Sequence, residues 1–285
     1  MGISAIIPNL NGEKLLPPLL DSLAELLAQG VVEEVVVADD GSEDHSRELV
    51  RKWGEGFRLV EKPPGAARGF GPNVNRGVRA ARGEVLAVLN SDLRLSGDPL
   101  TPLTEWLRDE GVGAVVPAVE GGPWEVESAI HLWVRRGLPW VRPLPEPPGE
   151  PLIATHFSQL CLHGACFLIR RQVWELMGGF DEGFRPAYFE DVDLGMRLNL
   201  AGFRLVLDPR VKVSHLHSQT VERELGRTKE AVMLKNQLRL VQKHRRYLGL
   251  ENPAGRGWLL LRGLREGVRL RGRQMAGYLA AALGP

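Results

Sequence analysis

Short apolar runs alternate with longer stretches of helical periodicity through the first half of the chain. The short runs are rich in β-branched residues, which favours strands. The longer stretches repeat apolar residues at every third or fourth position, a spacing that predicts amphipathic helices. We expect strands at 3–8, 35–38, 57–61, 85–89 and 114–116, and helices at 13–29, 42–53, 73–82 and 100–110.

The ends of the expected helices carry suitable residues. Gly30, Gly83 and Gly111 each follow a helix, where glycine readily ends it. Ser42, followed by two acids, is a good helix start. Alternating strands and helices predict an α/β fold whose parallel sheet is covered on both faces. Ligands of such sheets bind beyond the carboxyl ends of the strands, so residues just after each strand are the first candidates for a site.

The pattern breaks between Gly121 and Pro151. Six prolines between Pro139 and Pro151 exclude a helix or a central strand there. Two hypotheses stay open for this stretch, a surface excursion and a flexible lid or acceptor loop. Regular patterns return with strands at 165–169, 204–207 and 211–213, helices from 171 and at 190–201, and two closing helices at about 222–247 and 258–283.

Composition adds bounds to this picture. The chain has 285 residues, 44% apolar and 25% charged, which is typical of a globular protein with a large core. No apolar run approaches the roughly 18 residues of a membrane span, and no signal peptide is evident. Cys161 and Cys166 are expected on opposite faces of an extended segment, which argues against a disulfide. We therefore expect a cytoplasmic protein.

Charge is distributed unevenly along the chain. The net charge is +1, but residues 223–273 contain 14 basic and 4 acidic side chains, which leaves about −9 on the remainder. We expect a catalytic domain at 1–220 and a basic helical C-terminal extension at 221–285. The extension suits an anionic membrane surface, which would make the protein peripheral on the inner face of a membrane. In a second interpretation its apolar positions pack on the domain or form a homodimer.

Acids and amides follow two of the early strands. Asp40 follows the second strand, where a carboxylate can accept hydrogen bonds from the base or ribose of a nucleotide. Asn90, Ser91 and Asp92 follow the fourth strand, where a carboxylate can hold Mg²⁺ or Mn²⁺ together with a diphosphate. Taken alone, each group is more simply explained as a helix cap or a polar turn.

Further candidates lie later in the chain. Glu190 and Asp191 open a helix, whose dipole stabilises acids and would also keep Asp191 ionised, as a general base requires. His215 follows a later strand, and an imidazole near a divalent ion can serve as an additional ligand. A lone histidine or an acidic first helical turn is also common in proteins where it has only a structural role.

A glycine-rich segment at 69–77 lies between the third and fourth strands. It begins at Gly69 and carries Asn73 and Asn75, a composition that lets the backbone approach a phosphate or a sugar. Its spacing matches neither the Walker loop nor the dinucleotide fingerprint. Kinase and dehydrogenase functions therefore lose their main support.

Taken in order, these segments resemble the family 2 glycosyltransferases over residues 3–217. The resemblance rests on IIPNLNG, VVVADDGSEDHS, GFGPNVNRGVRAARGE, VLNSD, GGFDEGFRPAYFEDVDLGMRLNLAGFRL and VSHLH. It implies the GT-A fold, a Rossmann-like mixed sheet flanked by helices. It also implies inverting transfer of a sugar from a nucleoside-diphosphate sugar to an acceptor hydroxyl, with Mg²⁺ or Mn²⁺ as cofactor.

The resemblance implies roles for individual residues. Asp40 contacts the donor base, and Asp191 deprotonates the acceptor. Asp92 and His215 bind the metal. The other expected substrate contacts are Pro8, Asn9, Gly69, Asn73, Asn75, Asn90, Ser91 and Glu190. The triplet NSD at 90–92 replaces the commoner Asp-x-Asp. This leaves one carboxylate for the metal and favours a rhamnosyltransferase-like enzyme with a deoxysugar donor.

Two rival functions stay open. A nucleotidyltransferase has a related sheet and metal use, but the nucleotide half lacks the basic cluster that a triphosphate needs. A catalytically silent nucleotide-sugar-binding protein has no need of Asp92, Asp191 and His215 together. We expect no nucleic-acid partner, because the body is acidic and the basic tail lacks interleaved aromatics. We expect a saccharide or lipid-linked acceptor in cell-envelope polysaccharide or glycolipid synthesis.

Overall fold

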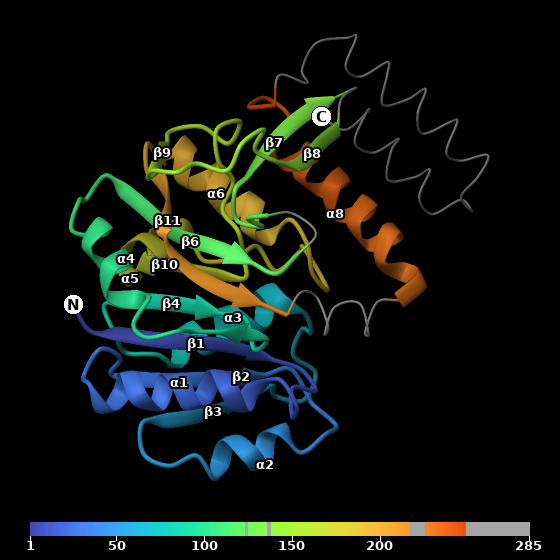
Figure 1. The fold of residues 1–285 in the computed structure, drawn as a ribbon. Coiled ribbons are helices and arrows are strands. Elements are labelled where there is room, and N and C mark those ends of the chain that lie inside the picture. The colour runs from blue at the N-terminus through green and yellow to red at the C-terminus, as the bar shows by residue number, and fades with distance from the viewer. Residues whose placement is uncertain (123–124, 136–137, 217–225, 249–285) are drawn as a thin grey trace.

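The computed structural model describes residues 1–122, 125–135, 138–216 and 226–248. These residues form one large mixed sheet with helices on both faces, beside a two-stranded hairpin (Figure 1). The expected α/β fold with a mixed sheet flanked by helices is confirmed. Residues 249–285, which include the helix expected at 258–283, lie outside the described residues.

The elements follow the expected order along the chain. The strands are β1 (Ile3–Asn9), β2 (Glu34–Asp39), β3 (Phe57–Glu61), β4 (Val85–Leu89), β5 (Leu93–Arg94), β6 (Val112–Glu120), β7 (Ile130–Arg135), β8 (Leu138–Pro143), β9 (Leu152–Ala154), β10 (Cys166–Arg170) and β11 (Arg204–His215). The helices are α1 (Leu16–Ala28), α2 (Ser46–Arg51), α3 (Phe70–Ala80), α4 (Leu100–Trp106), α5 (Arg171–Met177), α6 (Glu190–Leu200) and α8 (Lys229–His244), with a short 3-10 turn η1 (Gly226–Thr228). The two strands expected at 204–207 and 211–213 are one strand, β11.

The large sheet is built around β1, which pairs in parallel with β2 and β4. The strand order is β3-β2-β1-β4-β10-β6-β11-β5, and β9 pairs with β11. The alternating pattern predicts parallel strands, and β3, β2, β1 and β4 are parallel, but β10 runs antiparallel between β4 and β6, which makes the sheet mixed. Apolar periodicity identifies a strand but not its direction. The long connection from β6 to β10 lets the chain enter the sheet from the opposite end.

Both faces of the sheet are buried under helices. Along β1, Ile3, Ala5 and Ile7 enter the core beneath α1 and α4, whereas Ile6 enters the core beneath α3, α5 and α6. This alternation follows from the two-residue period of a strand. Cys161 and Cys166 are both buried and free.

The proline-rich stretch after Gly121 contains the antiparallel hairpin β7–β8. The hairpin forms its own two-stranded sheet. Its prolines therefore remove no hydrogen bond from a central strand of the large sheet. A third apolar cluster joins it to α6 and α8 through Leu132, Met196 and Leu238. Among the helices that the structure describes, none has both the length and the apolar composition needed to cross a bilayer.

Candidate active site

The carboxylate of Asp39 organises the loop after β2. Its Oδ1 accepts the backbone N–H groups of Gly41 and Ser42 at 3.0 and 2.9 Å, and its Oδ2 accepts the Ser42 hydroxyl at 2.5 Å. The expected helix start at Ser42 is therefore wrong, and α2 begins at Ser46. A short polar side chain that bonds to nearby groups competes with helix formation in this way.

Pro8 and Asn9 end β1 beside this loop. The Asn9 amide nitrogen donates to Asp39 Oδ2 at 2.9 Å, so this side chain helps to fix the loop. Its Oδ1 is buried and makes no hydrogen bond within the described residues. Pro8 lies opposite Ala38 in the parallel ladder of β1 and β2.

Asp40 is buried at the carboxyl end of β2, 4% exposed. Its Oδ2 accepts the backbone N–H of Gly69 at 2.8 Å, and its Oδ1 accepts Arg76 at 3.1 Å. Arg76 also donates to Asn73 Oδ1 at 2.8 Å, and the Asn73 amide donates to the Ala38 carbonyl at 2.7 Å. Burial raises the pKa of Asp40, and the Gly69 N–H and Arg76 offset part of that rise. The structure thus brings Asp40, Gly69 and Asn73 together.

Gly69 joins this region to the loop that precedes α6. Its φ is +127°, and a Cβ there would lie 2.7 Å from the carbonyl oxygen of Pro186. The next backbone N–H, of Phe70, donates to that same oxygen at 2.7 Å. Only glycine permits this conformation and this close approach. Helix α3 therefore begins at Phe70 and not near residue 73 as expected.

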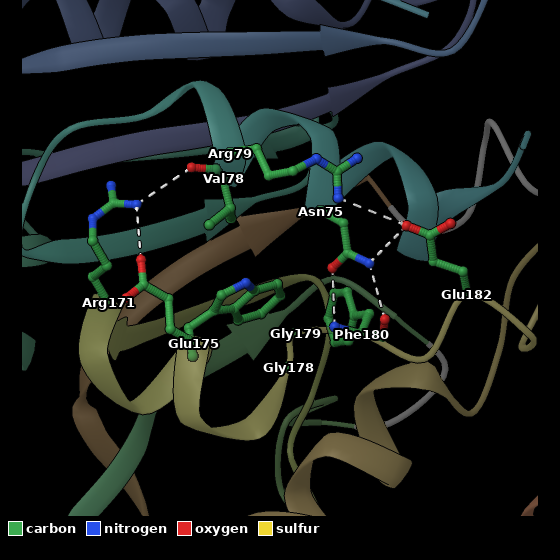
Figure 2. A pocket seen from close by; sticks show the side chains of 10 residues that line it. Asn75, Val78, Arg79, Arg171, Glu175, Gly178, Gly179, Phe180 and Glu182 are labelled. Carbon is green, nitrogen blue, oxygen red and sulfur yellow. Dashed lines mark hydrogen bonds and ion pairs between the residues drawn. The ribbon is translucent and has the colours of Figure 1, made fainter. Parts of the chain in front are cut away.

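Asn75 lies inside α3, and its amide is used by a loop. The nitrogen donates to the carbonyl oxygen of Phe180 at 2.9 Å, and the oxygen accepts the Phe180 N–H at 3.0 Å (Figure 2). Of the predicted site residues, Asn75 alone lines the adjacent cavity of about 530 Å³. Two ion pairs also line this cavity, Arg79 with Glu182 and Arg171 with Glu175, each at 3.9 Å. The structure places Asn75 with this loop and apart from Asp40.

Asp92 and His215 lie side by side. Asp92 follows β4 and His215 ends β11, so the sheet brings together residues 123 positions apart. His215 Nε2 is 2.9 Å from Asp92 Oδ1, and His215 Nδ1 is 2.8 Å from Glu127 Oε2. Although burial opposes the charge, hydrogen bonds to the two carboxylates raise the pKa of His215 to about 9. Sequence reasoning missed Glu127, because it lies in the stretch without periodicity.

The donor set near Asp92 fits a divalent cation. No group of three or more His, Cys, Asp or Glu side chains is arranged as a metal site within the described residues. Asp92 Oδ1 and His215 Nε2 lie 2.9 Å apart as a hydrogen-bonded pair, and both atoms could serve an ion once Nε2 releases its proton. The Asn90 Oδ1 is buried and makes no hydrogen bond to a described residue. Mg²⁺ and Mn²⁺ take oxygen ligands and commonly complete their shell with substrate phosphates.

Asp191 lies at the start of α6. Its Oδ1 accepts the N–H of Val192 at 2.8 Å, and its Oδ2 accepts the N–H of Gly164 at 2.9 Å. The next residue in that loop, Ala165, accepts the N–H of Asn90 at 2.8 Å. Two consecutive residues therefore connect Asp191 to the segment that carries Ser91 and Asp92.

Two acids in the first turn of α6, Glu190 and Asp191, have raised pKa values. Burial raises the pKa of Asp191, although the N–H groups of Val192 and Gly164 lower it in part. Burial, followed by the neighbouring charge of Asp191, raises the pKa of Glu190 well above its usual value. Glu190 Oε2 makes no hydrogen bond within the described part of the chain. A raised carboxyl pKa suits proton transfer near neutral pH.

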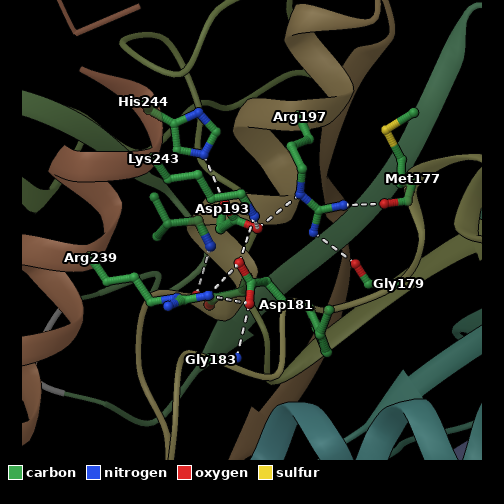
Figure 3. A network of polar contacts seen from close by, with 12 residues as sticks. Met177, Gly179, Asp181, Gly183, Asp193, Arg197, Arg239, Lys243 and His244 are labelled. Carbon is green, nitrogen blue, oxygen red and sulfur yellow. Dashed lines mark hydrogen bonds and ion pairs between the residues drawn. The ribbon is translucent and has the colours of Figure 1, made fainter. Parts of the chain in front are cut away.

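Helix α8 anchors α6 through Asp193, two residues beyond Asp191 (Figure 3). Asp193 is fully buried and contacts Arg197 and His244 at 2.8 Å each, and Lys243 at 2.8–2.9 Å. Lys243 also contacts Asp181 at 2.8 Å. Arg197 lies four positions from Asp193, but Lys243 and His244 lie 50 and 51 positions away, so local sequence patterns do not reveal this network.

Comparisons with known proteins identify the family to which this chain is similar. The model of the family described as "Glycosyl transferase family 2" matches residues 4–177, and that of "Glycosyltransferase like family 2" matches residues 149–241. The chain is 30% identical over 224 residues to the O-antigen biosynthesis protein RfbC of Myxococcus xanthus. That match covers 76% of this chain and 17% of the relative, so the chain spans only a small part of that protein.

Two further proteins are informative. The chain is 29% identical over 219 residues to the N-acetylglucosaminyl-diphospho-decaprenol L-rhamnosyltransferase of Mycobacterium tuberculosis, over 67% of this chain and 68% of the relative. The crystal structure of GalNAc-T7 with UDP, GalNAc and Mn²⁺ superposes with a TM-score of 0.67 at 17% identity. It covers 99% of this chain and 54% of that protein, a likeness that establishes the GT-A fold.

Proposed function

This chain belongs to glycosyl transferase family 2, and from that membership we propose that it is an inverting glycosyltransferase that uses a nucleoside-diphosphate sugar. The observation that carries the proposal is the connection through residues 164 and 165. This connection ties the proposed base, Asp191, to Asn90, which lies two residues before the proposed metal ligand, Asp92. Sugar transfer requires both functions close together, because the leaving group and the attacking hydroxyl share one anomeric carbon.

The proposed division of labour follows from the chemistry of each group. Asp92 and His215 would hold Mg²⁺ or Mn²⁺, which supplies positive charge to the departing diphosphate. Asp191 would accept the proton of the acceptor hydroxyl as that oxygen attacks the anomeric carbon. Its raised pKa brings the carboxylate closer to the basicity that proton removal needs. A single displacement from the opposite face inverts the anomeric centre.

The donor nucleotide would lie over the ends of β1 and β2. Asp40 is held by Arg76 and the Gly69 N–H, so its carboxylate has a fixed position for contact with the base or ribose. Asn9 and Asn73 frame the same end of the sheet. This location agrees with the general placement of ligands beyond the carboxyl ends of parallel strands.

We further propose a deoxysugar donor and a lipid-linked acceptor. The NSD triplet at 90–92 supports this choice, and so does the mycobacterial relative, which is named as a rhamnosyltransferase that acts on a decaprenol-linked sugar. The basic segment at 223–273 would hold the protein on an anionic membrane surface, where such an acceptor resides. Cell-envelope glycan synthesis is the setting that these features favour.

A panel of nucleotide sugars tests the donor proposal. Melting temperatures of the full chain would be measured with each donor, with and without Mn²⁺, for the wild type and Asp92→Ala. At a ligand concentration of about 100 Kd, binding adds roughly 2.7 kcal/mol, which corresponds to a rise of several degrees. We expect one class of donor to stabilise the wild type only with Mn²⁺. Stabilisation without any release of nucleoside diphosphate would instead indicate a silent binding protein.

A further inference from the structure

Glu127 is a buried carboxylate that the roles above do not use. It lies in the connection between β6 and β7 and is 3% exposed. Its backbone N–H donates to the Val119 carbonyl at 2.7 Å, which fixes the position of its Cα against β6. Its side-chain Oε2 lies 2.8 Å from His215 Nδ1, on the ring nitrogen opposite the one that faces Asp92.

Two consecutive glycines make room for this contact. Gly121 has a φ of +112°, and a Cβ there would lie 2.3 Å from the carbonyl oxygen of His215. At Gly122 a Cβ would lie 1.6 Å from Glu127 Oε1. Any larger residue at either position would displace His215 or Glu127. The turn after β6 is therefore shaped so that the carboxylate reaches the imidazole.

The hydroxyl of Ser128 supports the same turn. It donates to the Pro117 carbonyl at 2.6 Å and accepts the Val119 N–H at 3.0 Å. Both the Glu127 backbone and the neighbouring Ser128 side chain are therefore hydrogen-bonded to β6. A turn held at three points positions Glu127 with little freedom to move away from His215.

We propose that Glu127 is a positioning residue of the metal site, acting through His215. By accepting the Nδ1–H of His215, Glu127 leaves Nε2 as the nitrogen that faces Asp92 and a bound ion. A histidine ligand whose other nitrogen donates to a carboxylate is oriented and made more basic, and loss of such a partner typically weakens metal affinity roughly 10- to 100-fold. The inference rests on the proposed function, since it requires that Asp92 and His215 bind the ion.

The charge of Glu127 matters as well as its hydrogen bond. Asn90 is neutral, so among these neighbours Asp92 and Glu127 supply the negative charge around His215. An amide at position 127 could still accept the Nδ1–H, and it would cost less to bury than a carboxylate does. Glu127→Gln therefore separates the effect of the charge from the effect of the fold.

Mn²⁺ binding measures the effect without any turnover. The free Mn²⁺ signal in electron paramagnetic resonance would be titrated with the full chain at one neutral pH, with and without inorganic pyrophosphate. The variants are Glu127→Gln, Asp92→Ala, His215→Ala and the double variant of Glu127 and His215. Glu125→Gln is the matched control, because Glu125 is an exposed carboxylate of the same connection.

We expect Asp92→Ala to abolish Mn²⁺ binding and Glu127→Gln to weaken it roughly 10- to 100-fold, with Glu125→Gln unchanged. In the His215→Ala background, Glu127→Gln should not weaken Mn²⁺ binding further, because Glu127 acts through His215. If Glu127 only supported the fold, its replacement would still weaken binding in that background. If Glu127→Gln fails to fold by circular dichroism, Glu127→Asp takes its place in the same cycle.

Two results would overturn the inference, and they differ in what else they reject. Wild-type affinity in folded Glu127→Gln, together with loss of binding in Asp92→Ala, would reject the role of Glu127 alone. Equal binding by the wild type and Asp92→Ala, or no binding by the wild type in either arm, would reject the metal site itself and the inference with it.

Discussion

Replacing Asp193 by asparagine should destabilise the protein strongly, because this carboxylate is the buried centre of the contact between α6 and α8. Asp193 has no exposed side-chain surface and contacts the cationic side chains of Arg197 and Lys243 and the imidazole of His244. An asparagine has the same size, but it removes the negative charge. Its amide N–H group would also face the N–H donors of the residues around Asp193. The cations then lose their counter-charge.

The magnitude follows from how well each partner reaches water. Removing one partner of a fully buried ion pair costs about 3–5 kcal/mol. The His244 side chain is 5% exposed, but those of Arg197 and Lys243 are 18% and 31% exposed, so water compensates part of the loss. We therefore expect a cost near the lower end, about 3 kcal/mol. For a chain of this size that corresponds to a fall in melting temperature of about 6–12 °C.

The pH dependence has a definite sign. Although burial opposes it, hydrogen bonds from His244 and the nearby charge of Arg197 lower the pKa of Asp193 in the folded protein. A carboxyl whose folded pKa is depressed stabilises the fold above its unfolded pKa of about 3.9, and this contribution is lost as the pH falls through the folded value. The difference in unfolding free energy between wild type and Asp193→Asn should thus be constant near neutrality and shrink below about pH 4.

Differential scanning calorimetry and urea unfolding of both proteins provide the assay. Glu105→Gln is the control, since its exposed ion pair with Arg108 is worth only roughly 0.2–0.5 kcal/mol. A melting temperature for Asp193→Asn as close to the wild type as that of the control would refute the reasoning. So would a difference in unfolding free energy that grows towards acid pH.

Three further outcomes are expected. Asp191→Asn should retain donor affinity while turnover falls by ~10² or more, because the general base is lost; near-normal turnover would transfer that role to Glu190. Asp40→Asn should weaken nucleotide binding, measured by calorimetry, by roughly 10- to 150-fold, because it removes a hydrogen bond to a charged group. An unchanged Kd would exclude a contact between Asp40 and the donor. Deleting residues 256–285 should abolish salt-sensitive co-sedimentation with anionic liposomes. If the full chain does not bind such liposomes at low salt, the segment is a packing or oligomerisation element instead.

Much of the fold could be predicted because its strands are short apolar runs ended by glycines and acids. One rule, that ligands bind beyond the carboxyl ends of parallel strands, predicts both Asp40 and Asp92 as site residues. The direction of β10 could not be predicted, since an apolar run of five residues is the same in either direction. The helix predicted from Ser42 begins instead at Ser46, because the carboxylate of Asp39, the last residue of β2, accepts the Ser42 hydroxyl.

The remaining contacts could not be predicted because they join residues that lie far apart in the sequence. Glu127 follows no strand and belongs to no periodic segment, and only the turn at Gly121 brings it to His215. His244 similarly reaches Asp193 through the packing of α8, across 51 positions. Such contacts depend on how elements pack, which local patterns do not encode.

Calorimetric titration of a nucleoside diphosphate tests the central claim most directly. The base would be taken from the donor class that stabilises the protein, and wild type, Asp92→Ala and the exposed control Asp21→Asn would be titrated with Mn²⁺ and with a chelator. The account predicts binding by the wild type and Asp21→Asn only with Mn²⁺, and loss of that metal-dependent part in Asp92→Ala. Equal affinity of Asp92→Ala and the wild type in the presence of Mn²⁺ would contradict it.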